Sequence, residues 1–138
     1  MRKMKKTFLL SVYLLVASVV FAQSVSFAPP ASVGVGSVPL SVFVADVNLD
    51  GKPDLLTANY GSNSVSVRLG DGAGNFTGTT NISVGTNPQS VFVADVNLDG
   101  KPDFLTANTN DNTVSVRLGD GAGNFTGTTN ISVGTNPQ

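Results

Sequence analysis

The sequence repeats itself with a period of 49 residues. Residues 41–89 and 90–138 carry the same amino acid at 44 of 49 positions. Of the five differences, four fall between residues 60 and 64 of the first copy, and the fifth pairs Leu55 with Phe104. Two segments this similar must adopt the same local structure, so the chain is expected to fold from repeated units.

Each copy has the residue alternation of β-strands. Val65, Val67 and Leu69 alternate with polar residues, which is the period-two pattern of a strand with one apolar face. Residues 41–45 form a nearly continuous apolar run, and this predicts an inner strand that is buried on both faces. Separated by Gly and Asn, the predicted strands of the first copy lie at about residues 41–46, 54–59, 64–69 and 79–84.

Four short antiparallel strands in a repeat of 40 to 50 residues are typical of one β-propeller blade. The predicted fold class is therefore all-β, with two full four-stranded antiparallel blades, residues 41–89 and 90–138, after a partial repeat at residues 23–40. The partial repeat is recognised by Phe27, Gly36 and Pro39, which stand 49 residues before Phe76, Gly85 and Pro88. Closed rings need about four to eight blades, so we expect a fragment of a longer protein or a subunit that completes its ring by oligomerising.

The first 22 residues have the three parts of a secretory signal peptide. Residues 1–6 are basic, residues 8–21 are apolar, and Ala22 marks the expected cleavage point. The apolar run is shorter than the roughly 20 residues that span a bilayer, which favours cleavage over an uncleaved membrane anchor. We therefore expect a mature chain that is extracellular, at the cell surface or periplasmic, with no membrane insertion after cleavage.

The composition excludes most catalytic chemistry. The chain has no Cys, His, Trp or Glu, so thiolate or imidazole metal sites, Cys nucleophiles and Ser-His-Asp triads are absent. Four of the eight basic residues lie within residues 1–6, which leaves four basic residues against nine Asp in the rest of the chain. A nucleic-acid surface would need clustered Lys and Arg. We therefore expect no nucleic-acid partner and no enzyme activity.

Six of the nine Asp residues stand in two identical nine-residue segments, residues 46–54 and 95–103. Oxygen-bearing side chains at positions 1, 3 and 5, with Gly at position 6, follow the rule by which an EF-hand loop surrounds a hard cation. The bidentate Glu of an EF-hand is missing, because its position holds Thr57 and Thr106. The carboxylate at position 9 and the backbone carbonyl at position 7 can complete the coordination instead. The candidate ligands are Asp46, Asn48, Asp50, Lys52 and Asp54, with their counterparts Asp95, Asn97, Asp99, Lys101 and Asp103.

The ligand atoms distinguish between metals. Sites made only of oxygen select calcium or magnesium over zinc or copper, and a flexible loop with several carboxylates favours calcium. The alternative is a plain turn of Asp, Asn and Gly between two strands. Three Asp residues within nine positions repel one another unless a cation lies between them, so the sequence predicts Ca²⁺ at both loops.

Together with its flanking strands, the loop resembles an FG-GAP or VCBS-type repeat. The resemblance rests on the runs from Phe43 to Asn59 and from Val65 to Phe76, and it extends over residues 27–138. It implies blades of an integrin-alpha-like propeller, with the nine-residue loop as their calcium site. Two features depart from the family pattern: position 3 is Asn where integrin loops commonly carry Asp, which should weaken the site, and the repeats are too few for a ring.

Two further features have simpler explanations. The glycines of residues 70–76 are similar to a dinucleotide-binding loop, but the third Gly of that pattern falls on Asn75 and no helix follows. A hairpin turn is therefore predicted. Arg68 and Arg117 could bind a ligand carboxylate, but the alternation places both on the polar side of an outer strand, where a solvated surface is expected.

Strand parity predicts where a ligand would bind. In an antiparallel blade the first and third connections leave one end of the sheet, and the second connection leaves the other end. The carboxylate loops therefore share an end with the Gly-Asp-Gly turns, and nearly all the variation between the repeats lies at the opposite end. Variable loops on a fixed scaffold are where recognition is usually built. We expect ligand contacts around Tyr60 and Asp111, with tolerant surface turns as the alternative.

These observations predict a secreted, calcium-binding, non-catalytic β-propeller segment that serves as an adhesion or ligand-binding scaffold. The expected partners are calcium, a protein or carbohydrate ligand, and further blades in the same chain or in a homo-oligomer. A fold does not fix a function. The alternatives are an accessory module of an exported enzyme whose catalytic domain lies beyond residue 138, and a purely structural repeat array.

Overall fold

The structure, a computed structural model, describes residues 32–138. The predicted signal peptide and the start of the predicted partial repeat, residues 1–31, lie outside the described residues. The eight strands are β1 (Pro39–Ala45), β2 (Asp54–Asn59), β3 (Ser64–Gly70), β4 (Phe76–Ser83), β5 (Pro88–Ala94), β6 (Asp103–Asn108), β7 (Thr113–Gly119) and β8 (Phe125–Ser132). Within residues 32–138 no helix is long and apolar enough to cross a membrane.

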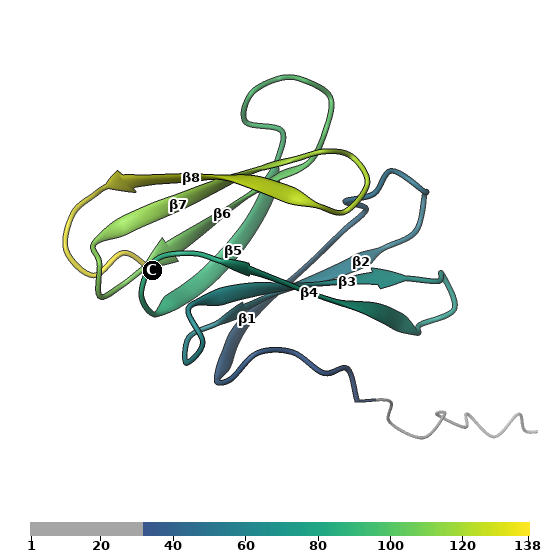
Figure 1. The fold of residues 1–138 in the computed structure, drawn as a ribbon, viewed down its shortest axis with the longest axis horizontal. Helices are drawn as coiled ribbons and strands as arrows, with labels where there is room; N and C mark the ends of the chain where they lie inside the picture. The colour runs from purple at the N-terminus through teal and green to yellow at the C-terminus, as the bar shows by residue number, and fades with distance from the viewer. Residues whose placement is uncertain (1–31) are drawn as a thin grey trace, which may run out of the picture. The chain divides into compact units, whose positions relative to one another are not determined.

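The strands form two four-stranded antiparallel sheets, one from each repeat (Figure 1). Their orders are β1-β2-β3-β4 and β5-β6-β7-β8, so every strand pairs with its neighbour in sequence. The same ladder register recurs in both sheets, with an irregularity at the same place in the third and fourth strands. The predicted all-β fold class with four-stranded antiparallel units is therefore confirmed.

The fourth strand is longer than the alternation indicated. It was predicted at residues 79–84, whereas β4 begins at Phe76. A register shift between Val67 and Leu69 lets Gly70 pair with Phe76. Gly78, with a φ of +95°, adopts a backbone conformation at this irregularity that a side chain would disfavour.

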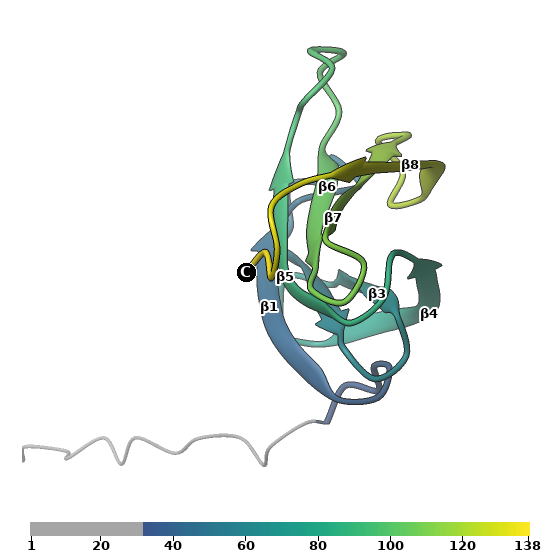
Figure 2. The same ribbon diagram turned by 90° about the vertical axis from the view of Figure 1, so that its left-hand side faces the viewer.

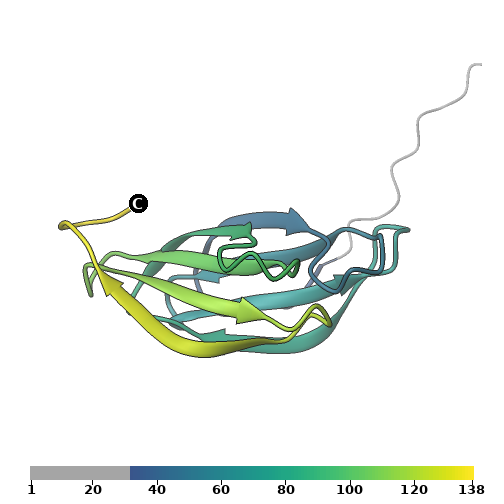
Figure 3. The same cartoon turned by 90° about the horizontal axis from the view of Figure 1, so that it is seen from above.

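The second sheet lies over the first, as the view from above shows (Figure 3). The first strands of the two sheets, β1 and β5, contact each other. They lie on one side of Figure 2, with β4 and β8 on the other. The sheets thus meet face to face along the inner part of each blade.

We call the two surfaces of each sheet its upper and lower faces. The upper face is the one that carries Leu56, Ala58, Val65 and Val67 in the first sheet and Leu105, Ala107, Val114 and Val116 in the second. The lower face carries Val42, Val44 and Leu55 in the first sheet and Val91, Val93 and Phe104 in the second. The core of the described chain lies between the upper face of the first sheet and the lower face of the second.

Two aromatic pairs lie at this junction, one within the second sheet and one between the two sheets. The Phe104 ring is fully buried and meets the Phe125 ring edge-on, at a centroid distance of 4.9 Å. The Phe43 and Phe92 rings lie 6.0 Å apart across the contact between β1 and β5. Such aromatic pairs each contribute about 0.5–1.5 kcal/mol beyond the area that they bury.

The inner strands are not buried on both faces, and this prediction was wrong. Val42 on the lower face of β1 is 59% exposed, and Phe92 on the upper face of β5 is 60% exposed. Each inner strand meets the other sheet on one face only. Within the described residues, each sheet covers only one face of the other.

The prediction that Arg68 and Arg117 lie on a solvated surface was also wrong, because both are only 5% exposed. Arg117 Nε and Nη2 donate to the Ser83 carbonyl at 3.1 and 3.0 Å. Arg68 Nε donates to the Gly34 carbonyl at 2.8 Å. In each case a carbonyl that precedes the sheet in sequence accepts from Nε on the lower face, and Nη1 donates to two carbonyls of the arginine's own sheet. Burial lowers the pKa of Arg117 from its ordinary value.

A polar network accompanies each arginine on the lower face. Asn59 Nδ2 donates to Ser66 Oγ at 2.9 Å, and Ser66 Oγ donates to Asn81 Oδ1 at 2.7 Å. The equivalent bonds of Asn108, Ser115 and Asn130 repeat this arrangement in the second sheet. Buried polar groups are stabilising only when they are hydrogen-bonded, so these side chains help to fix the spacing of the strands.

Candidate metal centre

The two carboxylate loops connect the first and second strands of each sheet. The first loop, residues 46–53, joins β1 to β2, and the second, residues 95–102, joins β5 to β6. Gly51 and Gly100 turn the chain with φ values of +81° and +83°. Glycine adopts this conformation without the strain that other residues suffer. The sequence therefore positions the loops through a Gly at the sharpest turn.

In the first loop the backbone amides gather the side-chain oxygens. Asp46 Oδ1 accepts a hydrogen bond from Asp50 N at 3.1 Å, and Asp46 Oδ2 accepts one from Gly51 N at 2.7 Å. Asn48 Oδ1 also accepts from Asp50 N, at 3.2 Å. Oxygens of the first and third loop positions thus converge on one amide, so the loop holds Asp46 and Asn48 close together.

Asp50 bonds to the end of the same loop. Its Oδ1 accepts from Lys52 N at 3.0 Å, and its Oδ2 lies 3.3 Å from Lys52 Nζ. The Lys52 backbone amide contributes most to lowering the pKa of Asp50, and the Asn48 and Lys52 side chains lower it further. Asp50 is therefore a stable carboxylate at neutral pH. The exposed ion pair contributes little energy, so a competing cation would displace the Lys52 ammonium at small cost.

Asp54, at the ninth position, is a fully buried residue. Its Oδ2 accepts from Val47 N at 2.9 Å and its Oδ1 accepts from Gly70 N at 2.8 Å. The side chain thus ties the start of the loop to the end of β3. The sequence singled out Asp54 only as a ligand, and its role as a link between strands was missed because nothing in the loop spacing points to it.

The second loop repeats the first. Asp95 accepts from Asp99 N and Gly100 N at 3.1 and 2.8 Å, and Asn97 Oδ1 accepts from Asp99 N at 3.0 Å. Asp103 accepts from Val96 N and Gly119 N at 3.0 and 2.8 Å, which matches the bonds of Asp54. The Lys101 ammonium lies 3.8 Å from Asp99. Two near-identical oxygen-lined loops result.

The side-chain oxygens of each loop suit a hard cation. Within residues 32–138 no three acidic side chains are already gathered as a metal site. A carboxylate has about four acceptor positions, so the amide bonds leave lone pairs on Asp46 and Asp50 for a metal. Two carboxylates, an amide oxygen and a backbone carbonyl in one exposed loop fit the oxygen preference of calcium. Asp54 keeps lone pairs as well but is already engaged by two amides.

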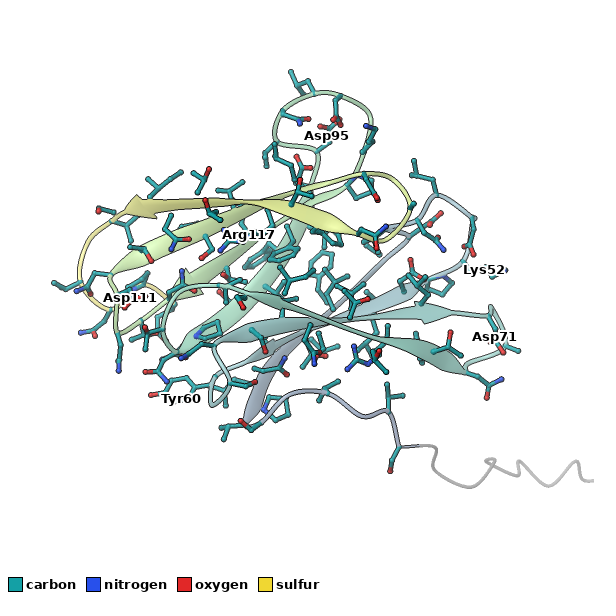
Figure 4. All side chains as sticks on the ribbon, viewed as in Figure 1. Lys52, Tyr60, Asp71, Asp95, Asp111 and Arg117 are labelled. Atoms are coloured by element: carbon teal, nitrogen blue, oxygen red, sulfur yellow. The ribbon has the colours of Figure 1, made fainter. Side chains whose placement is uncertain are left out.

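The Gly-Asp-Gly turns lie at the same end of the first sheet as the carboxylate loop, which Figure 4 shows by the positions of Lys52 and Asp71. Asp71 Oδ1 accepts from Ala73 N at 2.7 Å, and its Oδ2 accepts from Asn75 Nδ2 at 2.6 Å. The Asn75 side chain contributes most to lowering the pKa of Asp71, followed by the backbone amides of the turn. The predicted hairpin turn is confirmed.

The second connections, residues 60–63 and 109–112, lie at the opposite end, near the Tyr60 and Asp111 labels of Figure 4. Asp111 Oδ2 accepts from Thr86 N at 2.6 Å. Asn87 Nδ2 donates to the Tyr60 carbonyl at 3.1 Å. These turns therefore hold the connection between the two sheets, a role that the sequence comparison did not indicate.

Stacked four-stranded antiparallel sheets with a loop-strand pattern repeated in each define a β-propeller-type repeat module. Comparison with protein families gives the same result, because residues 46–106 and 95–138 each match the FG-GAP-like repeat. These matches cover most of the chain, which therefore belongs to the FG-GAP-like repeat family. No curated protein and no solved structure matches the chain.

Proposed function

We propose that this chain is a secreted, calcium-binding and non-catalytic propeller segment that acts as an adhesion or ligand-binding scaffold. One observation carries the proposal: both carboxylate loops hold their oxygens in the same hydrogen-bonded arrangement. Asp46 and Asp95 each accept two loop amides, with matching distances in the two repeats. Asp54 and Asp103 also tie the loop to the third strand of their sheet, but a turn needed only to join two strands does not require the further Asp residues at positions 1 and 5.

The proposed ligands are the Asp and Asn side chains at loop positions 1, 3, 5 and 9, with the carbonyls of Lys52 and Lys101. A bound calcium ion would neutralise the loop carboxylates and join residues that are spread along the loop. The chain's own contribution is to hold these oxygens near one another before the ion arrives. Extracellular calcium modules bind with dissociation constants of about 0.1–1 mM, and export would expose the loops to calcium.

The scaffold role is supported by the division between the two ends of each sheet. The carboxylate loops and the Gly-Asp-Gly turns are identical in both repeats, and residues 60–64 and 109–113 carry nearly all of the variation. We propose that calcium stiffens one end while a protein or carbohydrate ligand contacts the other. The absence of Cys, His and Glu from the whole sequence removes most of the side chains that catalysis uses, which supports a binding role.

Calorimetric titration tests the calcium proposal. After chelator treatment, the chain should bind two calcium ions with dissociation constants of about 0.1–1 mM. Asp50→Ala should remove one site and Asp99→Ala the other, because the two loops belong to different sheets. Asp71→Ala is the matched control, since it removes an exposed Asp at the same end of the sheet without touching either loop. Absence of heat at millimolar calcium, or equal loss of binding in the control, would refute the proposal.

A further inference from the structure

Equivalent residues of the two sheets differ sharply in exposure, although the repeats are nearly identical. On the upper side, Val47 in the carboxylate loop after β1 belongs to the core and is 1% exposed, whereas its counterpart Val96 is 44% exposed. On the lower faces the order is reversed, because Val91 is 2% exposed and its counterpart Val42 is 59% exposed. The neighbouring sheet causes the difference, since it covers the upper face of the first sheet and the lower face of the second.

Within residues 32–138 two apolar surfaces are therefore left open, one on each sheet. The free upper face of the second sheet carries the exposed side chains of Phe92, Val96, Leu118, Ile131 and Val133. Phe92 also lines a hollow on this face together with Leu105. The free lower face of the first sheet carries Leu40, Val42 and Val44, and a second hollow lies beside them. Open apolar surfaces of this kind mark sites of association.

Each free surface is a near copy of a surface that is already docked within the chain. The free lower face of the first sheet carries the residues of the lower face through which the second sheet docks, except that Leu40, Leu55 and Ser64 stand where that face has Gln89, Phe104 and Thr113. The free upper face of the second sheet repeats the residues of the upper face on which it docks. We propose that a second copy of this chain docks head to tail, with its first sheet on the second sheet of its partner, through the same junction. Such a contact is heterologous, and it can propagate.

The segment that precedes β1 sets a condition on this contact. Gly36 N donates to Ser66 Oγ at 3.1 Å, and 49 residues later Gly85 N donates to Ser115 Oγ at the same distance. Residues 34–38 therefore pack on the first sheet in the same way as the connection between β4 and β5 packs on the second sheet. In a docked pair, the C-terminal segment of one copy would need the place that residues 34–38 occupy in the other.

Of the two segments that would compete for this place, the C-terminal segment is the more weakly held. Within the described chain, residues 133–138 are held to their own sheet by three hydrogen bonds, from Val133 N, Asn136 N and Thr109 Oγ1. Residues 34–38 are held to the first sheet by five. Docking therefore displaces residues 134–138 of one copy and leaves the segment before β1 of its partner in place.

Light scattering after gel filtration tests the proposal, with chelator present so that calcium plays no part. The mature chain without residues 1–22 should exceed the mass of one copy, which is below the 14.1 kDa of the full sequence, as its concentration rises from about 10 µM to 1 mM. Val42→Asp and Ile131→Asp should each weaken association about a hundredfold, because each places an unpaired charge in the junction. Phe92→Asp provides a second test of the upper face, although it also removes the contact with the Phe43 ring in the same chain. Asn110→Asp, which adds the same charge in an exposed turn, should leave association unchanged.

Mixing the two variants distinguishes head-to-tail docking from unspecific adhesion. A Val42→Asp copy keeps its upper face unchanged and an Ile131→Asp copy keeps its lower face unchanged, so an equimolar mixture should form a complex of two chains and no larger species. Leu55→Phe, which supplies the counterpart of the buried Phe104 ring, should strengthen association. Removal of residues 134–138 should strengthen it as well, because no segment then has to be displaced.

Three results would overturn the proposal. The first is a wild-type chain that stays a single copy at about 1 mM. The second is an associating wild type whose two variants fail to complement each other, which would show that the apolar faces adhere without a defined register. The third is weaker association after removal of residues 134–138, which would place the contact elsewhere. None of these results depends on calcium, so the proposed function is tested separately.

Discussion

Replacement of Asp54 separates the structural role of the ninth loop position from its proposed role in calcium binding. Asp54→Ala leaves Val47 N and Gly70 N without the acceptors that they have at 2.9 and 2.8 Å. An amide that loses its partner at a buried position costs about 1–3 kcal/mol. Relief from burying the carboxylate charge offsets part of this, so we expect a loss of about 2–4 kcal/mol in the free energy of unfolding. That is a large share of the roughly 5–15 kcal/mol of a small domain.

The assay is urea denaturation followed by circular dichroism, first in chelator and then in millimolar calcium. In chelator, Asp54→Ala should lower the unfolding midpoint strongly. Asp50→Ala is the matched control, because Asp50 is exposed and a surface substitution of this kind changes stability by about 0.5 kcal/mol or less. In calcium, the wild type should gain about 1.4 kcal/mol per site at a tenfold excess of ion over its dissociation constant. Asp50→Ala should lose the gain from its own loop.

The reasoning fails if Asp54→Ala and Asp50→Ala unfold at the same urea concentration in chelator. Equal midpoints would mean that the bonds from Val47 and Gly70 contribute nothing to the fold. Asp103→Ala offers an independent repetition, since its carboxylate accepts the equivalent amides in the second sheet. A loss at Asp54 without a loss at Asp103 would likewise contradict the structural role.

Three further predictions concern other parts of the chain. Arg117→Met should lower the melting temperature and Arg117→Lys should not restore it, because the Arg fork places two N–H groups on one carbonyl of the first sheet. The folded state holds the pKa values of Asp71 and Asp120 below the ordinary value of about 3.9. The two ionised carboxylates should therefore stabilise the fold fully above that pH, and this stabilisation should be lost as the pH falls through the lowered pKa values. Measurement of the unfolding midpoint as a function of acid pH would show this loss. Exchange of residues 60–64 with 109–113 should alter the binding of an identified ligand and leave calcium affinity unchanged, whereas a ligand held directly by bound calcium would contradict this.

The strands could be predicted from sequence because their apolar residues alternate. Val65 and Val67 face the core as the pattern indicated, and the bounds of β2 agree with the prediction. The start of β4 could not be predicted, because the irregularity near Leu69 depends on a ladder with Thr77. Polar residues such as Thr77 and Thr79 carry no periodic signal of their own.

The burial of the polar faces was missed for a different reason. Alternation shows that Arg68 and Ser66 face away from Val67, but it does not show whether that second face meets water. In a stack of sheets the second face is covered as well, and here the segment before β1 crosses it. The repeat itself was the available signal, since stacked blades leave few faces open. The bond between Thr86 N and Asp111 was missed for the same reason, because the sequence pattern does not show that the segment between the sheets contacts this turn.

The pairing of each strand with its sequence neighbour also affects how faithfully the chain can fold. β1 and β5 differ only at Leu40 and Gln89, so their side chains give β6 little means of telling them apart. The native connection between first and second strands closes 8 residues, whereas pairing β1 with β6 would close 57. By loop-closure entropy this difference disfavours the wrong pairing by only about 1.7 kcal/mol. Refolding should therefore be prone to misregistered intermediates with exchanged strands, and the brevity of the carboxylate loop is the main protection against them.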